Sequence, residues 1–395
     1  MGTASAYYLV KAGVRVTLLE RLGLASGASG RNAGFVFYQT HGPGWTYQAA
    51  VVTRWLYEEL ARALPIDVEY RAGGGMIVGF EPEQFPLVRA YVERQGEMGH
   101  SMEFLGSDEA RAREPALAED VAAAAFSPDD AQVNPLRLTV GLAEAAATLG
   151  AQIRTGVEVT GLLRERSRVV GVETDEGPVR SRWVVNAAGP HSPRIGAFAG
   201  IRLPVSPRRV QIAVSHPMPP TVTGDVICGR RIVKSAAIFR DCQRRAFPDR
   251  EPEGPGGHDT HAGMGHMLLV RQTASGNVIL GESMDERIFQ DGVNVDGLRT
   301  SLAHIKRVMP ALGDLEVLRV WNGTLGDGPD GLPLIGEWSE APGLVIAAGH
   351  GGVGILQGPV TGLLVSQIVT GAPPAVPIEP VRPDRHNGAP QESRL

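Results

Sequence analysis

Apolar and polar residues follow two different periods along the chain, and together they predict an α/β protein. Near the start, apolar residues at helical spacing lead to Gly13, and a nearly unbroken apolar run follows at 14–20. A helix that stops at a glycine and leads into a buried strand is typical of a parallel sheet. The same α/β type of pattern occurs at two further places. At 135–149 a helix is followed by a strand, and at 343–371 a strand is followed by a glycine loop and a helix.

The pattern between these segments differs and predicts a second domain. It indicates amphipathic helices at 47–64 and 86–99, and mixed strands from 204 to about 320 with a hairpin that turns at 275–277. We therefore expect two interleaved domains and a poorly ordered, proline-rich tail. The α/β domain takes residues 1–40, 135–205 and 326–372, the mixed-sheet domain takes 41–134 and 206–325, and the tail takes 373–395.

Composition narrows the class of protein. Of 395 residues, 43% are hydrophobic and the net charge is -5, which allows a sizeable core and gives no electrostatic case for nucleic-acid binding. Two isolated cysteines, Cys228 and Cys242, argue against a disulfide framework and favour a reduced, cytoplasmic setting. No apolar run reaches the length of a transmembrane segment, and the start does not resemble a signal peptide.

The opening segment has the spacing of a dinucleotide-binding unit that lacks its first half. In such units a third glycine begins the helix and an acid at the end of the second strand binds a ribose, roles that Gly2 and Glu20 match. The alternative is an ordinary helix, turn and strand with a chance glutamate. Because the first strand and the GxG are missing, we expect about 10–25 residues upstream of an internally assigned Met1.

The loop that follows Glu20 is rich in small and hydroxyl residues. Ser26, Ser29, Arg31 and Asn32 lie among glycines, where hydroxyls, backbone N–H groups and a guanidinium can point at phosphates. A solvated flexible loop would explain the glycines but not their place directly after the acidic strand end.

The order of these motifs identifies a family resemblance. The segments ASGASGRNAG, VVNAAG, DGLPLIG and AAGHGGVGI follow the opening unit in turn. Together, from Gly2 to Gly371, they resemble the FAD-dependent amine and amino-acid oxidoreductases related to D-amino-acid oxidase, glycine oxidase and sarcosine oxidase. The resemblance implies a Rossmann-like FAD-binding domain interleaved with a substrate domain, and FAD as cofactor.

The resemblance also implies which residues contact FAD. Backbone N–H groups of the C-terminal glycine loop would stabilise negative charge at the pyrimidine end of the flavin. The expected contacts, from the ribose and pyrophosphate to the flavin, are Gly2, Glu20, Arg21, Ser26, Gly27, Ser29, Arg31, Asn32, Ala33, Val159 at the adenine, Ala187, Ala188, Gly189, Asp330, Gly331, Gly349, Gly351, Gly352, Val353, Gly354 and Ile355.

Departures from the family pattern carry information. Gly323 stands where sarcosine-oxidase-type members tether FAD to a cysteine, so we expect non-covalent FAD. Leu325 and Gly352 stand where glycine-oxidase-type members carry arginines for the substrate carboxylate. The chain therefore looks closer to proline, hydroxyproline and opine dehydrogenases, which oxidise secondary amines and some of which are subunits of larger complexes.

Few residues are candidates for the substrate pocket. We predict catalytic or pocket roles for His350, Arg271 and Tyr38; the alternatives are a structural histidine, a surface salt bridge and simple packing. His41 can also line the pocket, and Trp321 fits the core. His258, His261 and His266 lie in or beside a Gly/Pro-rich insertion without acidic ligands at useful spacing, so we predict no metal site.

The resemblance implies oxidation of a C–N bond by hydride transfer to flavin N5, followed by hydrolysis of the imine. It leaves open whether oxygen, a partner subunit or a quinone accepts the electrons, and whether the protein forms an oligomer. Two rival hypotheses remain. A truncated, FAD-poor subunit would explain the missing GxG, and an NAD(P) dehydrogenase would explain the opening unit but not AAGHGGVGI.

Overall fold

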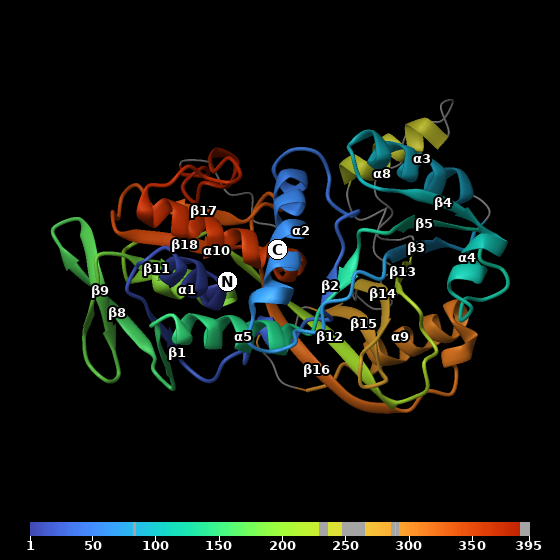
Figure 1. Ribbon diagram of the computed structural model, residues 1–395, viewed down its shortest axis with the longest axis horizontal. Helices are drawn as coiled ribbons and strands as arrows, with labels where there is room; N and C mark the ends of the chain where they lie inside the picture. Colours follow the sequence, from blue (N-terminus) through green and yellow to red (C-terminus); the bar gives the residue numbers. More distant parts are fainter. Residues whose placement is uncertain (82–83, 229–235, 247–264, 286–288, 290–291, 388–395) are drawn as a thin grey trace.

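The computed structural model describes residues 1–81, 84–228, 236–246, 265–285, 289 and 292–387. Its strands form two groups toward opposite ends of an elongated molecule (Figure 1). One group is an eight-stranded mixed sheet in which only β13 and β3 run parallel. Its strand order is β16 (Val317–Asp327), β12 (Ser206–Pro217), β15 (Asn277–Asp285), β14 (Gly265–Gln272), β13 (Asp225–Cys228), β3 (Gly75–Gly79), β5 (Ala123–Ser127) and β4 (Glu103–Gly106).

The second group consists of smaller sheets. β1 (Thr17–Glu20) pairs in parallel with β7 (Gln152–Thr155), and β11 (Val184–Asn186) pairs in parallel with β18 (Leu344–Ala348). All five residues of β18 are buried, as its apolar run predicted. The remaining strands are β17 (Leu334–Glu337) beside β18, the antiparallel β8 (Val159–Glu165), β9 (Arg168–Thr174) and β10 (Val179–Arg180), and the pair β2 (Phe35–Val36) and β6 (Ala131–Gln132).

Helices cover both groups. α1 packs between α5 and α10, and Gly362 of α10 lies so close to α1 that a Cβ there would be 2.6 Å from the carbonyl carbon of Ala4. Only glycine allows this approach. The helices are α1 (Gly2–Lys11), α2 (Trp45–Ala63), α3 (Gln84–Glu97), α4 (Ser107–Arg113), α5 (Pro135–Thr148), α6 (Ser192–Ala197), α8 (Ala236–Ala246), α9 (Val295–Val308) and α10 (Gly354–Thr370), with short 3-10 turns η1 (Ala28–Gly30), η2 (Gly189–His191), η3 (Pro310–Leu312), η4 (Gly351–Val353) and η5 (Glu379–Val381).

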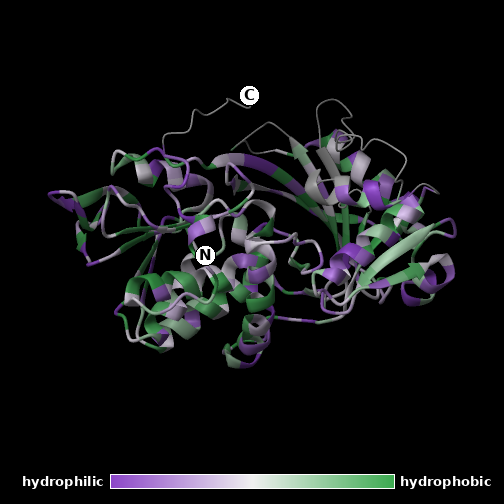
Figure 2. Ribbon diagram, turned by 90° about the horizontal axis from the view of Figure 1, so that it is seen from above, coloured by the Kyte–Doolittle hydropathy of each residue, from purple (hydrophilic) through white to green (hydrophobic). Residues whose placement is uncertain are grey.

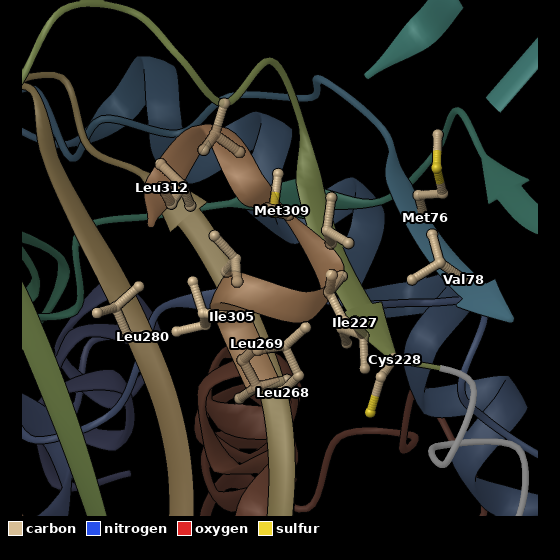
Figure 3. Packing of buried hydrophobic residues seen from close by; sticks show 14 of the residues in the cluster. Met76, Val78, Ile227, Cys228, Leu268, Leu269, Leu280, Ile305, Met309 and Leu312 are labelled. Atoms are coloured by element: carbon tan, nitrogen blue, oxygen red, sulfur yellow. The ribbon is translucent and has the colours of Figure 1, made fainter. Parts of the chain in front are cut away.

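Each group has its own core. Figure 2 shows hydrophobic residues on the helices near the N-terminus and, separately, along strands at the other end. In the large sheet, Ile305 of α9 and the following Met309 and Leu312 pack against Leu268 and Leu280 (Figure 3). Burying each such side chain contributes roughly 1.5–3 kcal/mol, so this face of the sheet is closed by α9 and does not hold a ligand.

The structure confirms the fold class and most of the predicted elements. The helices predicted at 47–64 and 86–99 are α2 and α3, and the predicted hairpin is β14–β15. The division into domains stays a prediction, and β16 crosses its boundary at 325/326. Val159 does not lie in the strand directly after α5, which is β7, but begins the next strand, β8.

The predicted absence of any apolar run long enough to span a membrane was wrong for residues 351–370. Among the described residues this segment, which contains α10, passes a test of length and hydropathy. Half of it is buried inside the protein, where it packs against α1 and α2. Such packing is what a core helix requires, so the segment is weak evidence for a membrane span. Its glycines and small residues kept it from resembling a span in the sequence.

The predicted tail is ordered over most of its length. Val376 and Val381 are buried, and Trp45 donates a hydrogen bond from Nε1 to the carbonyl of Pro377 at 2.9 Å. Arg385 forms an ion pair with Asp330 at 2.7 Å. Two apolar anchors and an ion pair therefore hold a segment whose composition suggested disorder. Residues 388–395 and most of the Gly/Pro-rich insertion, with His258 and His261, lie outside the described residues.

Candidate active site

The C-terminal glycine loop joins β18 to α10. Gly349 and Gly351 have φ values of 78° and 52°, which favour glycine. The Gly328 N–H donates to the Gly349 carbonyl at 3.0 Å, so the end of β16 fixes the start of the loop. Among the described residues no side chain caps α10, and its first turn holds no acidic residue. The free N–H groups therefore make this helix N-terminus an electropositive end that suits an anionic group.

His350 lies within this loop but points into the protein. It is 8% exposed, and its Nε2 is 2.9 Å from the hydroxyl oxygen of Thr361 in α10. Burial lowers the pKa of His350 to about 3. The imidazole is therefore neutral at pH 7 and engaged with α10. This geometry fits the structural alternative, and a catalytic role for His350 stays a prediction.

The loop at 26–34 contacts the β16 edge of the large sheet. Arg31 donates from Nε to the Ser26 carbonyl at 3.1 Å and from Nη1 to the Asn322 carbonyl at 2.7 Å. A Cβ on Gly323 would lie 3.1 Å from the Cβ of Arg31. Asn32 accepts from the Gly34 N–H at 2.9 Å and so shapes the loop. Arg31 and Asn32 therefore organise this segment, and the indole N–H of Trp321, predicted to be core, donates to the Arg31 carbonyl at 3.3 Å.

Arg271 is buried beneath this loop and does not form the surface salt bridge that was one interpretation. It is 3% exposed and donates to the carbonyl of Ala33, to Gln132 Oε1 at 2.6 Å and to the carbonyl of Val133 at 3.5 Å. Its guanidinium is thus occupied by acceptors of the protein itself. This arrangement makes Arg271 a support of the loop, and contact with a substrate carboxylate stays a prediction.

Two buried carboxyl groups accompany Arg271, and the sequence patterns did not suggest either. Asp225 faces Arg271 across β13 and β14 by the register of Val226 and Val270, and neither of its oxygens has a hydrogen-bond partner among the described residues. Burial raises the pKa of Asp225 to about 7 and that of Asp130 to about 8. Asp130 accepts from the backbone N–H of Tyr38 at 2.7 Å. Asp130 therefore supports the segment at Tyr38, which follows the loop.

Tyr38 packs away from the large sheet. It is 3% exposed and lies beside Tyr57 and Tyr70, and burial raises the pKa of its hydroxyl well above the ordinary value. Tyr57 donates to the carbonyl of Ile355, at the start of α10, at 2.6 Å. Tyr38 therefore belongs to a tyrosine cluster behind the glycine loop, as the packing alternative had it. His41 is also buried, with Nδ1 3.2 Å from the Phe37 carbonyl.

The expected adenosine-binding residues meet at the ends of β1 and β11. A Cβ on Gly2 would be 3.8 Å from Ala187 and 3.9 Å from Leu18, so α1 begins between these two strands. Glu20 accepts from the Leu22 N–H at 2.8 Å. Among the described residues α1 also begins without a side-chain cap. Of the other expected contacts, Arg21 follows β1, Val159 begins β8, Gly27 and Ser29 lie at η1, and Ala188 and Gly189 follow β11. Asp330 is held by Arg385 and His386.

The sequence patterns missed one charged pair at the site, Arg208 and Asp327. Arg208 Nε lies 2.6 Å from Asp327 Oδ2, and Nη2 lies 3.0 Å from Oδ1. A Cβ on Gly352 would be 3.8 Å from Arg208 Nη2. The pair thus stands between the large sheet and the glycine loop. In the sequence, Arg208 is followed directly by Arg209 on a predicted strand. Because side chains alternate along a strand, the sequence showed only that one of these two arginines faces inward.

Comparison with known proteins agrees with this arrangement. The model of a family described as FAD dependent oxidoreductase, DAO, matches residues 1–368. A glycine oxidase of Geobacillus kaustophilus is 29% identical over 398 residues, covering 98% of this chain and 95% of the relative. Hydrogen cyanide synthase subunit HcnC of Pseudomonas aeruginosa is 26% identical over 82% of this chain and 70% of its own length.

Solved structures show the same fold. The crystal structure of glycine oxidase from Geobacillus kaustophilus superposes with a TM-score of 0.83 at 26% identity, covering 98% of this chain and 96% of that chain. That of L-proline dehydrogenase from P. horikoshii has a TM-score of 0.81 at 24% identity, covering 97% and 94%, and supports the fold alone.

The residues present fit FAD. The uncapped N-terminus of α10 offers free N–H groups where the family pattern places the pyrimidine end of the flavin, and α1 begins between the ends of β1 and β11. Glu20 ends β1 with its carboxylate half-exposed, as a ribose ligand must be. Glycines at 349, 351 and 352 leave the loop without side chains that would block a flat ring. The loop at 26–33 and these two helix ends would hold the cofactor.

Proposed function

The chain belongs to the family of FAD-dependent oxidoreductases that act on amino-acid or amine substrates, and we propose that it oxidises the C–N bond of an amino acid or secondary amine. In this reaction FAD, when bound, accepts hydride from the α-carbon at N5. The other product is an imine, which water hydrolyses to a carbonyl compound and an amine. The protein must therefore orient the substrate, keep its nitrogen neutral and exclude water until the hydride has left.

One observation carries this proposal. The edge of the large sheet formed by β16 and β12 reaches both loops that the cofactor would contact: Gly323 lies against Arg31, and Arg208 lies against Gly352. A substrate held on this edge is therefore adjacent to both loops. The opposite face of the sheet is closed by α9, so this side alone is suited to a substrate among the described parts of the sheet.

The side chains on this edge can orient a substrate and limit its contact with water. Trp321 and Leu325 are only partly buried and pack against the core of the large sheet, which gives the site an apolar wall. A low-polarity wall disfavours an ammonium ion and so favours the neutral amine that can lose hydride. Hydride transfer requires no acid–base residue of the protein, in keeping with the engaged, neutral His350.

The cofactor is proposed to be bound without a covalent link. Gly323 occupies the tether position, and both cysteines are buried elsewhere, Cys228 in β13 and Cys242 in α8. Acid precipitation should release all of the flavin into the supernatant; flavin that stays with the protein pellet would contradict this. We also propose a cytoplasmic protein, with oxygen, a quinone or a partner subunit as acceptor.

The test of the proposed function is anaerobic bleaching of the flavin in FAD-loaded protein. Glycine, sarcosine, proline, D-amino acids and N-alkyl amino acids should be added one at a time. At least one should bleach the flavin, and exposure to air should then separate an oxidase, which yields peroxide, from a dehydrogenase, which needs a dye. If none of these compounds reduces the flavin, the proposed reaction is wrong.

A second candidate is a subunit with little or no FAD. It is favoured by the likeness to HcnC, which is named as a subunit of hydrogen cyanide synthase. A purified protein that is colourless and that added FAD does not turn yellow would support this candidate. A yellow protein that amines bleach would exclude it.

A further inference from the structure

Arg208 lies beside the glycine loop and is bound to one carboxylate and one weak acceptor. The Nε and Nη2 atoms are bound to the carboxylate of Asp327. On the other edge Nη1 lies 2.8 Å from the sulfur of Met284, which is a weak acceptor. The side chain is 34% exposed. Glu282 adds a second negative charge near this guanidinium and, after Asp327, helps to raise its pKa. The Nη1 donors, bound to a sulfur atom, can exchange this weak acceptor for a stronger one.

Arg208 lies next to two uncharged residues, Leu325 and Gly352. In the ladder of β12 and β16, Arg208 is the direct partner of Leu325. Across the gap to the glycine loop, the position of Gly352 lies 3.8 Å from Arg208 Nη2. These are the two positions at which the motif pattern led us to expect no guanidinium for a substrate carboxylate. Both of them adjoin the guanidinium of Arg208.

We propose that Arg208, projecting from β12, binds the carboxylate of the substrate at the place that Leu325 and Gly352 leave uncharged. This inference rests on the proposed function and makes it narrower, because the substrate is then an amino acid and not a simple amine. A guanidinium and a carboxylate form a two-point contact, which fixes the direction of the α-carbon as well as its position. Arg208 would thus determine specificity.

Asp327 prepares Arg208 for this task. It holds one edge of the guanidinium in place, so the other edge loses little side-chain entropy when a carboxylate binds. Asp327 can occupy its position because residue 351 is glycine: a Cβ there would overlap Asp327 Oδ1. The backbone of Asp327 also pairs with His350. The glycine loop and the carboxylate anchor are therefore one connected unit.

The experiment compares substrates that differ only in the carboxylate, in FAD-loaded protein. Proline is paired with pyrrolidine, and sarcosine with dimethylamine. The unmodified protein should prefer the carboxylated member in kcat/KM by on the order of 100-fold. Arg208→Gln should remove most of that preference through KM, and Arg208→Lys should restore part of it. Arg319→Gln is the matched control, because Arg319 is an exposed arginine about 20 Å along the same pair of strands.

A binding measurement makes the result independent of turnover. Calorimetric titration with acetate should show a dissociation constant on the order of 100-fold higher for Arg208→Gln than for the unmodified protein and Arg319→Gln. Equal preference and equal acetate affinity in Arg208→Gln and the unmodified protein would overturn the proposal. If no member of either pair bleaches the flavin, the proposed reaction fails, and the acetate titration still decides the role of Arg208. If Arg208→Gln does not fold, Arg208→Lys and Asp327→Asn replace it, each with an expected intermediate loss of acetate affinity.

Discussion

Two arginines on the large sheet, Arg271 on β14 and Arg208 on β12, have opposite surroundings. Arg271 is fully buried, and the protein supplies its acceptors from Ala33, Gln132 and Val133. Arg208 is 34% exposed, bound to Asp327 on one edge and to the weakly accepting sulfur of Met284 on the other. The first is part of the framework that holds a loop, and the second is available to a ligand. A buried arginine whose donors are all bound by the protein has a structural role. We expect an arginine that is held by a carboxylate on one edge and only weakly bound on the other to be able to bind a ligand.

The largest expected effect concerns Arg271. Replacing it with Ala should lower the free energy of unfolding by about 3–5 kcal/mol, because three acceptors lose their donor and Asp225 loses the positive charge beside it. The same change at Arg208 should cost about 1 kcal/mol or less, since its ion pair is partly exposed. Urea denaturation of the FAD-loaded variants measures both. Similar losses for the two variants would break the comparison.

The next effect concerns the pH dependence of stability at the Arg271 end. Asp225 has a folded pKa raised to about 7 by burial, well above its unfolded value, so the folded state retains a proton that the unfolded state releases above about pH 4. Stability should therefore fall as pH rises from about 4 to 7 and should not depend on this group below that window. Two neighbours affect this titration. Asp130, whose pKa is also raised, interacts with Asp225, and the positive charge of Arg271 lowers the pKa of Asp225.

Asp225→Asn tests this expectation, because it removes the charge and keeps the shape. Denaturation of the variant and the unmodified protein at pH 4, 6 and 8 should show a smaller decline for the variant. The gain at pH 8 should be a few kcal/mol. A variant whose stability declines as steeply as that of the unmodified protein would show that Asp225 is ionised in the folded state.

A smaller effect distinguishes two neighbouring glycines at the Arg208 end. Gly351→Ala forces a side chain into a backbone with φ 52° and against Asp327, which should cost roughly 1–3 kcal/mol and weaken acetate binding by disturbing Arg208. At Gly352 an added Cβ meets Arg208 Nη2 at ordinary contact distance, 3.8 Å, so Gly352→Ala should be tolerated. Thermal unfolding and acetate titration of the two variants provide the comparison, and a more harmful Gly352→Ala would contradict it.

The smallest effect concerns Tyr38. Among the described residues, Tyr70 alone affects its buried hydroxyl by a side-chain hydrogen bond, so Tyr38→Phe should change stability by about 1 kcal/mol or less and leave KM unchanged. Tyr57→Phe is the matched variant and should cost about 1 kcal/mol, because it removes the bond to Ile355. A rise in KM for Tyr38→Phe alone would show that Tyr38 reaches the substrate.

Local chemistry in the sequence was sufficient to predict the family and FAD as its cofactor. Glycines, an acid and a helix with fixed spacing identify a dinucleotide-type unit, because each must stand at one place along the chain to approach a phosphate or a ribose. Gly349 and Gly351 were predicted for the same reason, and the structure gives both a positive φ. The hairpin at 275–277 also followed from its turn residues.

The substrate side could not be predicted in the same way. Arg271 and Arg208 both stand on strands with alternating side chains, and the sequence shows neither which strand lies beside them nor which loop covers them. The pairing of β12 with β16, more than 100 residues apart, put Arg208 beside Leu325 and Asp327. The pairing of β13 with β14 and the cover of the 33–36 loop buried Arg271.

The sequence alone thus determined the family resemblance and the α/β class, and it led to the prediction of residues that contact the cofactor, because these depend on spacing within short segments. Only the tertiary structure decided that His350 and Tyr38 turn inward, that residues 373–387 are packed, and that Arg208 lies between Asp327 and a weakly accepting sulfur beside the glycine loop. Whether a polar side chain supports the protein or meets a ligand depends on the acceptors that distant strands and loops bring to it.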